Sequence, residues 1–370
     1  MKLTRRETLA GAAALGASAC VTMPEPQAMA DAHPASGRTL SRIAFGSCAK
    51  QSKDQPIWNA VNAAEPDLFI FLGDNIYADT RDPKVMADKY AMLAAKPGFQ
   101  KLRANTPVCA IWDDHDYGED DAGADYPMKD ESRRQFCDFW GESADSVRRT
   151  RDGIYAANMF GPAGQRVQVI LPDLRWNRTP IRKLDLGGKT YAAWQTEQQK
   201  AGAPVPGPYE RNPALDASML GEPQWSWLEQ QLRQPADVRV LASSLQVLAD
   251  FAGWEGWINY ARDHQRLFAA IRDAKANGLV CISGDTHYAE LSMLDLNTPY
   301  PIWDLTSSGL TEVWPVLPPN ALRVGDALRE NNFGLIDIDW SKRELNLQAC
   351  DVTGEVRISR RVPLDALRVG

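Results

Sequence analysis

The chain has 370 residues, of which 44% are hydrophobic and 24% charged, a composition typical of a globular protein with ample apolar core. Its formal net charge of -7 argues against a nucleic-acid-binding surface, because phosphate contacts of that kind need clustered Lys and Arg. Any phosphate that the protein binds must therefore be met by metal ions and a few local arginines.

The first residues have the pattern of an export signal. A basic start containing Arg5 and Arg6 precedes the small apolar run 11–19. The paired arginines resemble the twin-arginine pattern, in which folded proteins are exported, and the alternative is a general secretory signal. We interpret residues 1–20 as a twin-arginine-like export signal, with the twin-arginine export machinery as its partner.

Cys20 stands at a candidate lipidation site. It follows Ala17-Ser18-Ala19, which resembles a bacterial lipoprotein cleavage site with Cys20 as the lipid anchor, and cleavage near Ala30 is the alternative. Residues 21–40, rich in proline and small residues, are interpreted as a flexible linker. We therefore expect an exported bacterial protein, either periplasmic or anchored to the membrane as a lipoprotein.

Strand-like and helix-like segments alternate from residue 41 onward, which is typical of an α/β sheet. The predicted strands are 42–45, 67–72, 107–112, 155–160, 166–171, 238–242 and 279–283. The predicted helices lie near 56–65, across 83–104, and near 130–140, 222–234 and 262–277. Three alternating runs at 333–340, 345–350 and 356–362 indicate antiparallel strands. Residues 41–370 are predicted to form one continuous domain.

Residues 180–220 are the main irregular stretch, with many glycines and prolines. A loop of this length in a compact domain is usually functional or mobile. In the sequence it lies between the acidic clusters at 112–118 and 283–288, which are described next. Two interpretations remain: a loop that covers the site formed by these clusters, or an ordinary surface loop.

Three clusters of acids and histidines directly follow short apolar runs, at 73–79, 112–118 and 283–288. Side chains at the carboxyl ends of parallel strands converge on one crevice. Two of the chain's four histidines, His115 and His287, lie inside these clusters. Carboxylates and imidazoles placed there can hold two cations, which activate a water molecule and neutralise anionic oxygens. The pattern therefore favours phosphoester hydrolysis.

Cys48 follows the first predicted strand by way of Gly46-Ser47, so it is expected in the same crevice. A thiolate at that position can bind a transition metal, and a structural thiol is the alternative. Cys109 and Cys281 lie inside predicted buried strands, where a free thiol acts as a small hydrophobic group.

The order of these motifs resembles the alkaline phosphatase D (PhoD-like) family of metallophosphoesterases. The motifs are Gly46-Ser47-Cys48, Gly73-Asp74 with Tyr77, Trp112-Asp113-Asp114-His115-Asp116 and Ser283-Gly284-Asp285-Thr286-His287. The resemblance covers about residues 41 to 310. It implies an α/β fold in which a calcineurin-like metallophosphoesterase β-sandwich is flanked by helices, with residues 41–370 as the catalytic domain.

The resemblance also implies two metal ions at the strand ends. The implied ligands of a ferric ion (Fe3+) are Cys48, Asp74, Tyr77 and His287. The implied ligands of Ca2+, or of another divalent metal, are Asp74 as the bridge, Asp114 and Asp285. The ligand chemistry agrees with this division, since thiolate, phenolate and imidazole suit iron and carboxylates suit calcium.

His115 stands where members of the superfamily place a catalytic histidine that contacts phosphate and protonates the leaving alkoxide. Such a positioned acid contributes about 10² to 10⁴ in rate. Arg175 and Arg178 are candidates for binding the substrate's phosphate, because guanidinium matches phosphate geometry. For Arg178, a surface salt bridge is the alternative.

Two positions depart from the family pattern. The chain has Asp120-Asp121 where related sequences commonly have Asn-Asp, so a charged side chain replaces a neutral one near the metals, and Asp121 is a further candidate ligand. The motif that supplies a metal-binding histidine in the wider superfamily here offers Gln246, which is interpreted as a weak ligand or a packing residue.

The expected function is that of an exported, metal-dependent phosphoester hydrolase, an alkaline phosphatase or phosphodiesterase in which a metal-activated hydroxide attacks phosphorus. Its preference between monoesters and diesters stays open. One alternative is a phosphodiesterase or phospholipase D-like enzyme acting on lipid headgroups. Another is an exported metal-binding protein without catalysis, which would keep Cys48, Asp74, Tyr77 and His287 but tolerate the loss of His115.

Overall fold

The computed structural model describes residues 37–214, 216–250 and 252–370. The predicted export signal, Cys20 and most of the predicted linker lie outside this part of the chain. None of the helices in the described ranges has the length and apolar character needed to cross a membrane.

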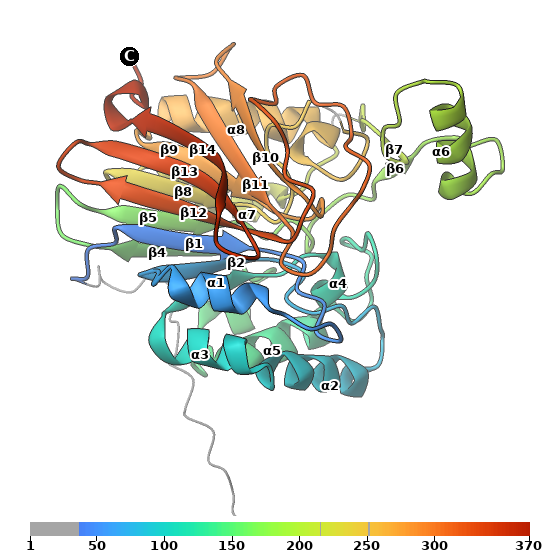
Figure 1. The fold of residues 1–370 in the computed structure, drawn as a ribbon, viewed down its shortest axis with the longest axis horizontal. Helices are drawn as coiled ribbons and strands as arrows, with labels where there is room; N and C mark the ends of the chain where they lie inside the picture. Colours follow the sequence, from blue (N-terminus) through green and yellow to red (C-terminus); the bar gives the residue numbers. More distant parts are fainter. Residues whose placement is uncertain (1–36, 215, 251) are drawn as a thin grey trace, which may run out of the picture.

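Two six-stranded sheets pack face to face and form the centre of the fold (Figure 1). The first sheet has the order β14-β13-β12-β1-β2-β3, with β1 (Arg42–Gly46), β2 (Leu68–Leu72), β3 (Val108–Ile111), β12 (Asn332–Asp339), β13 (Glu344–Asp351) and β14 (Val356–Pro363). The strands β1, β2 and β3 are parallel, whereas β12, β13 and β14 form an antiparallel group that joins them through β1.

The second sheet has the order β10-β11-β9-β8-β5-β4, with β4 (Ala156–Phe160), β5 (Val167–Leu171), β8 (Val238–Ala242), β9 (Leu279–Ser283), β10 (Ala289–Leu294) and β11 (Ile302–Ser307). Its four inner strands are parallel, and an antiparallel strand lies at each edge. Both sheets thus contain the parallel core that the alternating sequence pattern predicted.

Helices flank the two sheets (Figure 1). Those beside the first sheet are α1 (Ile57–Ala63), α2 (Pro83–Ala94), α3 (Pro97–Asn105) and α5 (Lys129–Trp140), and those beside the second are α7 (Gly221–Leu232) and α8 (Ala261–Asp273). The short α4 (Asp114–Tyr117) begins just after β3. This arrangement confirms the predicted β-sandwich flanked by helices.

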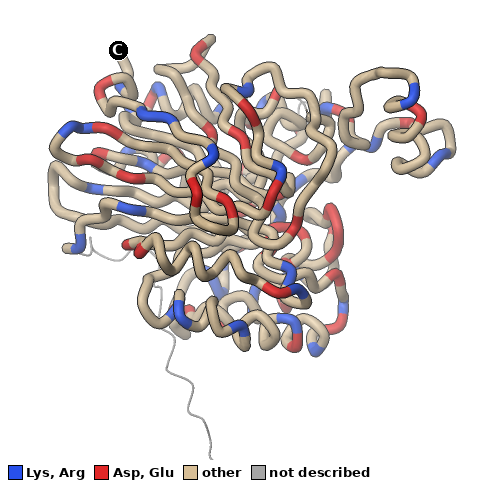
Figure 2. The backbone as a smooth tube through the Cα atoms, in the orientation of Figure 1, with Lys and Arg blue, Asp and Glu red and all other residues tan. Residues whose placement is uncertain are grey.

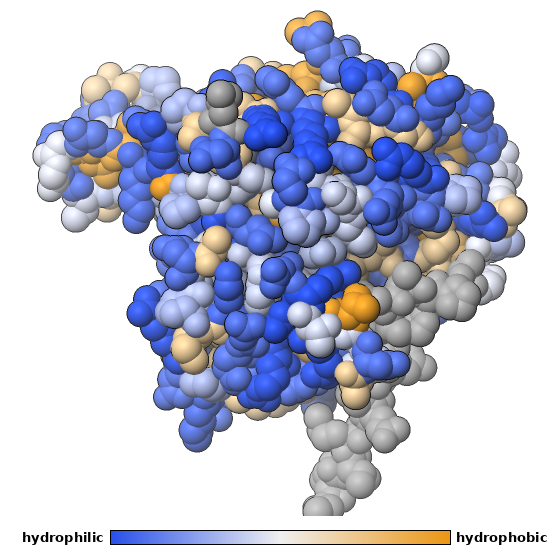
Figure 3. All heavy atoms as spheres, turned by 180° about the vertical axis from the view of Figure 1, so that it is seen from behind, coloured by the Kyte–Doolittle hydropathy of each residue, from blue (hydrophilic) through white to orange (hydrophobic). Residues whose placement is uncertain are grey.

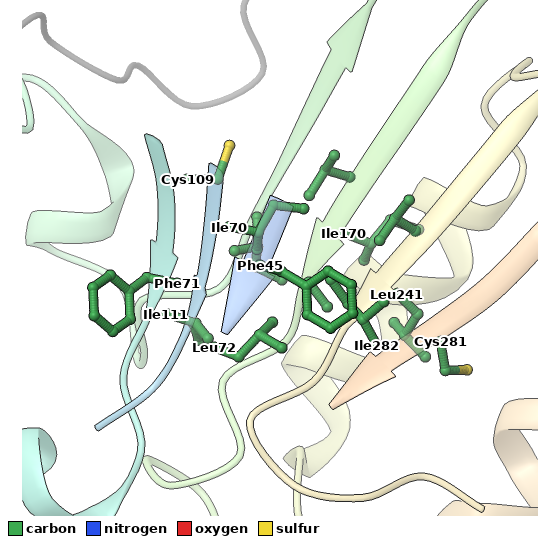
Figure 4. Close-up of a cluster of buried hydrophobic side chains, with 14 of the residues drawn as sticks. Phe45, Ile70, Phe71, Leu72, Cys109, Ile111, Ile170, Leu241, Cys281 and Ile282 are labelled. Carbon is green, nitrogen blue, oxygen red and sulfur yellow. The ribbon is translucent and has the colours of Figure 1, made fainter. Parts of the chain in front are cut away.

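The strand β2 shows why its residues form a buried strand. All five of its side chains are buried. Because successive side chains of a strand point to opposite faces, Phe69 and Phe71 pack on the helix side, where Trp58 of α1 lies 5.6 Å from the Phe69 ring. Ile70 lies on the other face, where Figure 4 shows it with Phe45, Ile170 and Ile282 between the sheets. A continuous apolar run is what a strand covered on both faces requires.

The predicted strands and helices are found close to their expected positions, but β10 and β11 were not predicted. Both strands bury a carboxylate, Glu290 in β10 and Asp304 in β11, which interrupts the apolar pattern. The burial is compensated by partners distant in sequence: Arg323 donates to Glu290 at 2.5 Å, and the backbone N–H of Val247 donates to Asp304 at 2.8 Å.

The stretch 180–220, expected to be irregular, contains α6 (Tyr191–Lys200) between the short strands β6 (Arg182–Lys183) and β7 (Tyr209–Glu210). No residue of α6 is buried, so the sequence carries no amphipathic signal there. These elements form an arm, residues 182–210, that stands off from the sheets (Figure 1). In Figure 2, Lys and Arg are interspersed with Asp and Glu over most of the molecule.

Replacing Gly334 by alanine is expected to destabilise the sandwich. Gly334 of β12 lies opposite Phe45 of β1, and an added Cβ would overlap the Phe45 ring. Overpacking of this kind costs about 1–3 kcal/mol, so thermal unfolding should shift down by several degrees. Gly37→Ala, where a Cβ would meet nothing within 4 Å, is the control. Equal melting temperatures for the two variants would contradict this packing.

Candidate metal centre

The carboxyl ends of strands from both sheets meet at one place, and two glycines allow the approach. A Cβ on Gly73, which follows β2, would lie 2.5 Å from the Asp113 Cβ. A Cβ on Gly284, which follows β9, would lie 2.6 Å from the Ser47 Oγ. Only residues without a side chain fit at these contacts, so the sequence brings the segments after β1, β2, β3 and β9 together.

Four residues at these strand ends have left-handed backbone conformations although none is glycine. Their φ angles are 63° for Cys48, 50° for Asp74, 73° for Asp285 and 61° for His287. Each such residue costs energy and persists where surrounding contacts fix it, often at a functional site. The chain turns sharply after each strand. Cys48, Asp74 and His287 then contribute to one group of potential ligand atoms, and Asp285 contributes to another.

Potential metal-ligand atoms lie within 4.8 Å of one another in overlapping groups. The groups are Cys48 with Asp74 and His287, Asp74 with Asp114 and His115, Asp113 with Asp114 and Asp285, and Asp114 with Asp120 and Asp121. Asp74 and Asp114 each belong to more than one group, so the site can hold more than one cation. Five of the six predicted ligands are thus brought together, and the sixth, Tyr77, lies beside them.

The group of Cys48, Asp74 and His287, with Tyr77 beside it, offers a sulfur, an imidazole nitrogen and a phenol oxygen as potential ligand atoms. The Cys48 Sγ lies 3.3 Å from Asp74 Oδ2, and the Tyr77 Oη lies 3.0 Å from His287 Nε2. Burial and the neighbouring Asp74 carboxylate raise the pKa of the Cys48 thiol, so a thiolate there needs a cation beside it. Gln51 holds Tyr77 in place, accepting from its backbone N–H at 2.8 Å and donating to its carbonyl at 3.1 Å.

The carboxylates form a dense, buried negative cluster. Burial raises the pKa of Asp285, and the nearby Asp113 and Asp114 carboxylates raise it further. Asp74 Oδ1, Asp113 Oδ2 and Asp114 Oδ1 have no hydrogen-bond partner among the described residues. Because unpaired buried carboxylate oxygens are costly, this donor set fits cations. The sequence expectation of metal ions agrees with these contacts.

Two acidic residues of the cluster at 112–118, Asp113 and Asp116, hold neighbouring segments of the site together through hydrogen bonds. Asp116 accepts from the backbone N–H groups of Asp74 and Asn75 at 3.2 Å and of Asp113 at 2.7 Å. It therefore ties the end of β2 to the end of β3. Asp113 Oδ1 accepts from Arg175 Nε at 2.6 Å and from Ser244 Oγ at 2.7 Å, which joins the first sheet to the second.

Arg175 and Arg178, predicted to contact the substrate's phosphate, are buried and paired with carboxylates. Their side chains are 0% and 1% exposed. Arg175 lies 2.6 Å from Glu255, and Arg178 forms an ion pair with the same carboxylate and donates to the carbonyl of Asp121. In this structure both arginines orient acids of the site, and a direct contact with phosphate stays a prediction.

His115 lies at the edge of the carboxylate cluster. Its Nδ1 is 2.6 Å from Asp79 Oδ1, its side chain is 18% exposed, and its ring centroid is 4.2 Å from that of Tyr77. Burial lowers its pKa, but the charges of Asp114, Asp74 and Asp79 outweigh burial and raise the pKa to about 11. His115 is therefore a proton donor in the metal-free cluster, and cations among these acids would lower its pKa.

The two weaker candidates, Asp121 and Gln246, differ in their placement. The Asp121 backbone donates to Asp114 Oδ2 at 2.8 Å, and its carboxylate belongs to the fourth ligand group with Asp120. Gln246 donates to Glu290 at 2.8 Å and to Thr306 at 3.0 Å. Its amide nitrogen thus binds side chains of β10 and β11 in the second sheet, and its role as a weak ligand stays a prediction.

Sequence reasoning missed three residues around the centre. Ser308 Oγ lies 3.1 Å from Cys48 Sγ, and Glu255 joins the two arginines. The ammonium of Lys50 lies 5.2 Å from the centroid of the Tyr77 ring. The position of Lys50, two residues after Cys48, was a usable signal, whereas nothing in the sequence indicated that Glu255 meets Arg175 and Arg178.

Comparisons with known proteins agree with this geometry. The model of the PhoD-like phosphatase family matches residues 43–332. No curated protein matches the chain. Among solved structures, one titled "Structure of PhoD" has 14% identity and a TM-score of 0.64, covering 89% of this chain and 70% of its own. A dimetal phosphatase from Danio rerio has 14% identity and a TM-score of 0.51, covering 90% of this chain and 100% of its own.

A third solved structure, described as GAP50, the anchor in the inner membrane complex of Plasmodium, has 11% identity and a TM-score of 0.53, covering 90% of both chains. At such identities the likeness shows the fold alone. The calcineurin-like fold expected from the sequence motifs is thereby confirmed.

Metal removal is expected to lower the melting temperature, because the buried carboxylates then repel one another. Linkage predicts about 2.7 kcal/mol of stabilisation when the free ion is at about 100 times its dissociation constant. Asp285→Asn, which removes one candidate ligand, should shrink the metal-dependent rise measured by calorimetry with and without chelator. The control is Asp263→Asn. The Asp263 carboxylate is buried and accepts a hydrogen bond from Ser218 at 2.7 Å, but it lies outside the ligand groups, so the metal-dependent rise in melting temperature should persist. A chelator without effect on the parent protein would contradict the metal centre.

Proposed function

Since the chain belongs to the PhoD-like phosphatase family and is a metal-dependent phosphoesterase, we propose a reaction and residue roles for its metal centre. The reaction is hydrolysis of phosphate esters, carried out by an exported protein. The observation that carries the proposal is that two groups of potential ligand atoms share Asp74, and that one of them includes His115, whose Nδ1 is paired with Asp79.

The donor sets suggest different ions on the two sides of Asp74. We assign Cys48, Asp74, Tyr77 and His287 to Fe3+, and Asp74, Asp114 and Asp285 to Ca2+ or another divalent ion. When bound, the ions supply an activated water molecule and neutralise charge on the phosphate oxygens. The protein's own contribution is to hold these donors, through Asp116, Ser308 and Arg175, in one fixed arrangement.

His115 is proposed as the catalytic acid. Asp79 occupies its Nδ1 side, at 2.6 Å, which leaves Nε2 for the leaving oxygen of the ester. Asp79 acts as a positioning residue that fixes the orientation of the ring. A protein that only stored or carried metal would gain nothing from this partly exposed pair, so the geometry favours catalysis over the non-catalytic alternative.

Lys50 is proposed to bind the outer oxygens of the phosphate. Arg175 and Arg178 are both paired with Glu255 in the interior, whereas the Lys50 ammonium stands over the ring of Tyr77 at the surface side of the centre. A flexible ammonium can follow the phosphate as charge moves during the reaction. The basic side chains thus have different proposed roles: the two arginines orient the acidic residues, and Lys50 binds the substrate.

His115→Asn is expected to lower the rate of hydrolysis by about 10²–10⁴, because the leaving oxygen loses its proton donor. The assay uses paired aryl phosphate monoester and diester substrates, and iron and calcium are quantified in the same preparation. Asp79→Asn should show a smaller loss, since it only loosens the ring. In both variants the metal content should stay at the parent value.

The control is His264→Asn, because this buried histidine of α8 lies outside all the ligand groups. Parent activity in His115→Asn would remove His115 from the mechanism. Bound metal without hydrolysis of either substrate by the parent protein would favour the non-catalytic alternative.

Lys50→Met is expected to raise KM by about tenfold with a smaller effect on kcat, because a charge-assisted contact to bound phosphate is lost. Lys84→Met is the control. Lys84 is paired with Asp88 at 2.6 Å and both side chains are exposed, so its removal should leave KM within about twofold. Equal effects of the two substitutions would show a general loss of positive charge instead of a specific contact.

A further inference from the structure

A row of four aromatic side chains leads from the metal centre to the arm. The members of this aromatic row are Trp314, Trp254, Tyr191 and Trp194, and each is partly exposed. Successive ring centroids are 5.5, 5.2 and 5.8 Å apart. None of the roles assigned above uses these side chains.

The inner end of the row is bound to the centre itself. The backbone N–H of Trp314 donates to the carbonyl of His287 at 2.9 Å. Trp254 directly precedes Glu255, the carboxylate that holds Arg175 at 2.6 Å. The first two rings of the row therefore belong to residues whose backbones adjoin the centre.

The outer end of the row belongs to the arm. Tyr191 and Trp194 lie on α6, and the arm rejoins the body where the N–H of Gly207 donates to Ala252 at 2.8 Å and that of Tyr209 donates to Gly253 at 2.9 Å. Seen from behind, the projecting arm carries apolar residues among hydrophilic ones (Figure 3). Backbone contacts thus fix the arm beside the segment that carries Trp254.

We propose that the aromatic row is a subsite for a planar aromatic ring carried by the phosphoester substrate, an inference that rests on the proposed function. The Trp254 ring meets those of Trp314 and Tyr191 at 75° and 76°, so these rings do not stack on one another. An edge-to-face partner covers at most one face of a ring, and the partial exposure of all four side chains leaves ring surface for a flat ligand. The matching substrate is amphiphilic, with an anionic phosphate at the cations and a flat apolar group on the row.

Binding of three phosphonates to the metal-loaded protein tests this subsite without requiring turnover. Phenylphosphonate, cyclohexylphosphonate and methylphosphonate share the anionic group and differ only in the organic group, and calorimetry gives each dissociation constant. Phenylphosphonate should bind about tenfold more tightly than methylphosphonate, and more tightly than the cyclohexyl compound of similar size.

Two substitutions in the row should reduce the phenyl-to-methyl ratio toward one: Trp254→Ala and Trp314→Ala, which remove the two rings nearest the centre. Trp314 is partly exposed and lies outside the helices and strands, so its variant tests the row even if Trp254→Ala fails to fold. The matched control is Trp227→Ala. Trp227 lies on α7, and its ring centroid is 4.7 Å from that of Tyr155, so its loss should leave the phenyl-to-methyl ratio at the value of the parent protein.

Equal constants for the three phosphonates would overturn the subsite and leave the proposed function standing. Equal binding of the phenyl and cyclohexyl compounds would overturn the assignment to aromatic groups. If metal is bound but no phosphonate binds, both the phosphoester function and the subsite are overturned. A ratio that falls in Trp227→Ala as much as in Trp254→Ala would also count against the row.

Discussion

Four carboxylates at the junction of two sheets, those of the buried Asp74, Asp113 and Asp114 and of the half-buried Asp285, are the constraint to which the rest of the structure responds. Charges this close and this poorly hydrated repel one another and are costly to bury. Arg175 compensates them from the interior side, where it contacts Asp113 and lies 3.5 Å from Asp114. Asp74 Oδ1 and Asp113 Oδ2 have neither a hydrogen bond nor an ion pair among the described residues, and they remain for metal ions. The cluster therefore lowers the stability of the metal-free fold and provides the ligands for metal binding.

The two sheets serve this cluster by presenting the ends of their parallel strands to one another. Asp116 binds the backbones of two strand ends, and Ser244 at the end of β8 donates to Asp113 across the interface between the sheets. Apolar residues such as Phe45, Ile70 and Ile170 fill the space between the sheets (Figure 4). A rigid core is needed here, because metal ligands that shifted by an ångström would lose their geometry.

Much of this fold could be predicted because its signals are local. A buried strand such as β2 is a continuous apolar run, and Asp74 and His287 each come within a few residues of the end of a strand. What could not be predicted depends on contacts between distant residues. Glu290 and Asp304 made two strands look polar, and only the folded chain shows Arg323 and Val247 compensating them. For the same reason the pairing of Arg175 with Glu255 could not be predicted, because the two residues are distant in the sequence.

The arm contributes nothing to the hydrophobic core: among the described residues, none between Trp176 and Ala217 belongs to the core cluster. The sheets and the metal centre therefore do not depend on its sequence. An insertion, deletion or exchange in this segment would change what surrounds the reacting phosphate while the catalytic apparatus stays intact. In evolutionary terms, this segment can diverge without changing the residues that form the core cluster and the candidate metal centre.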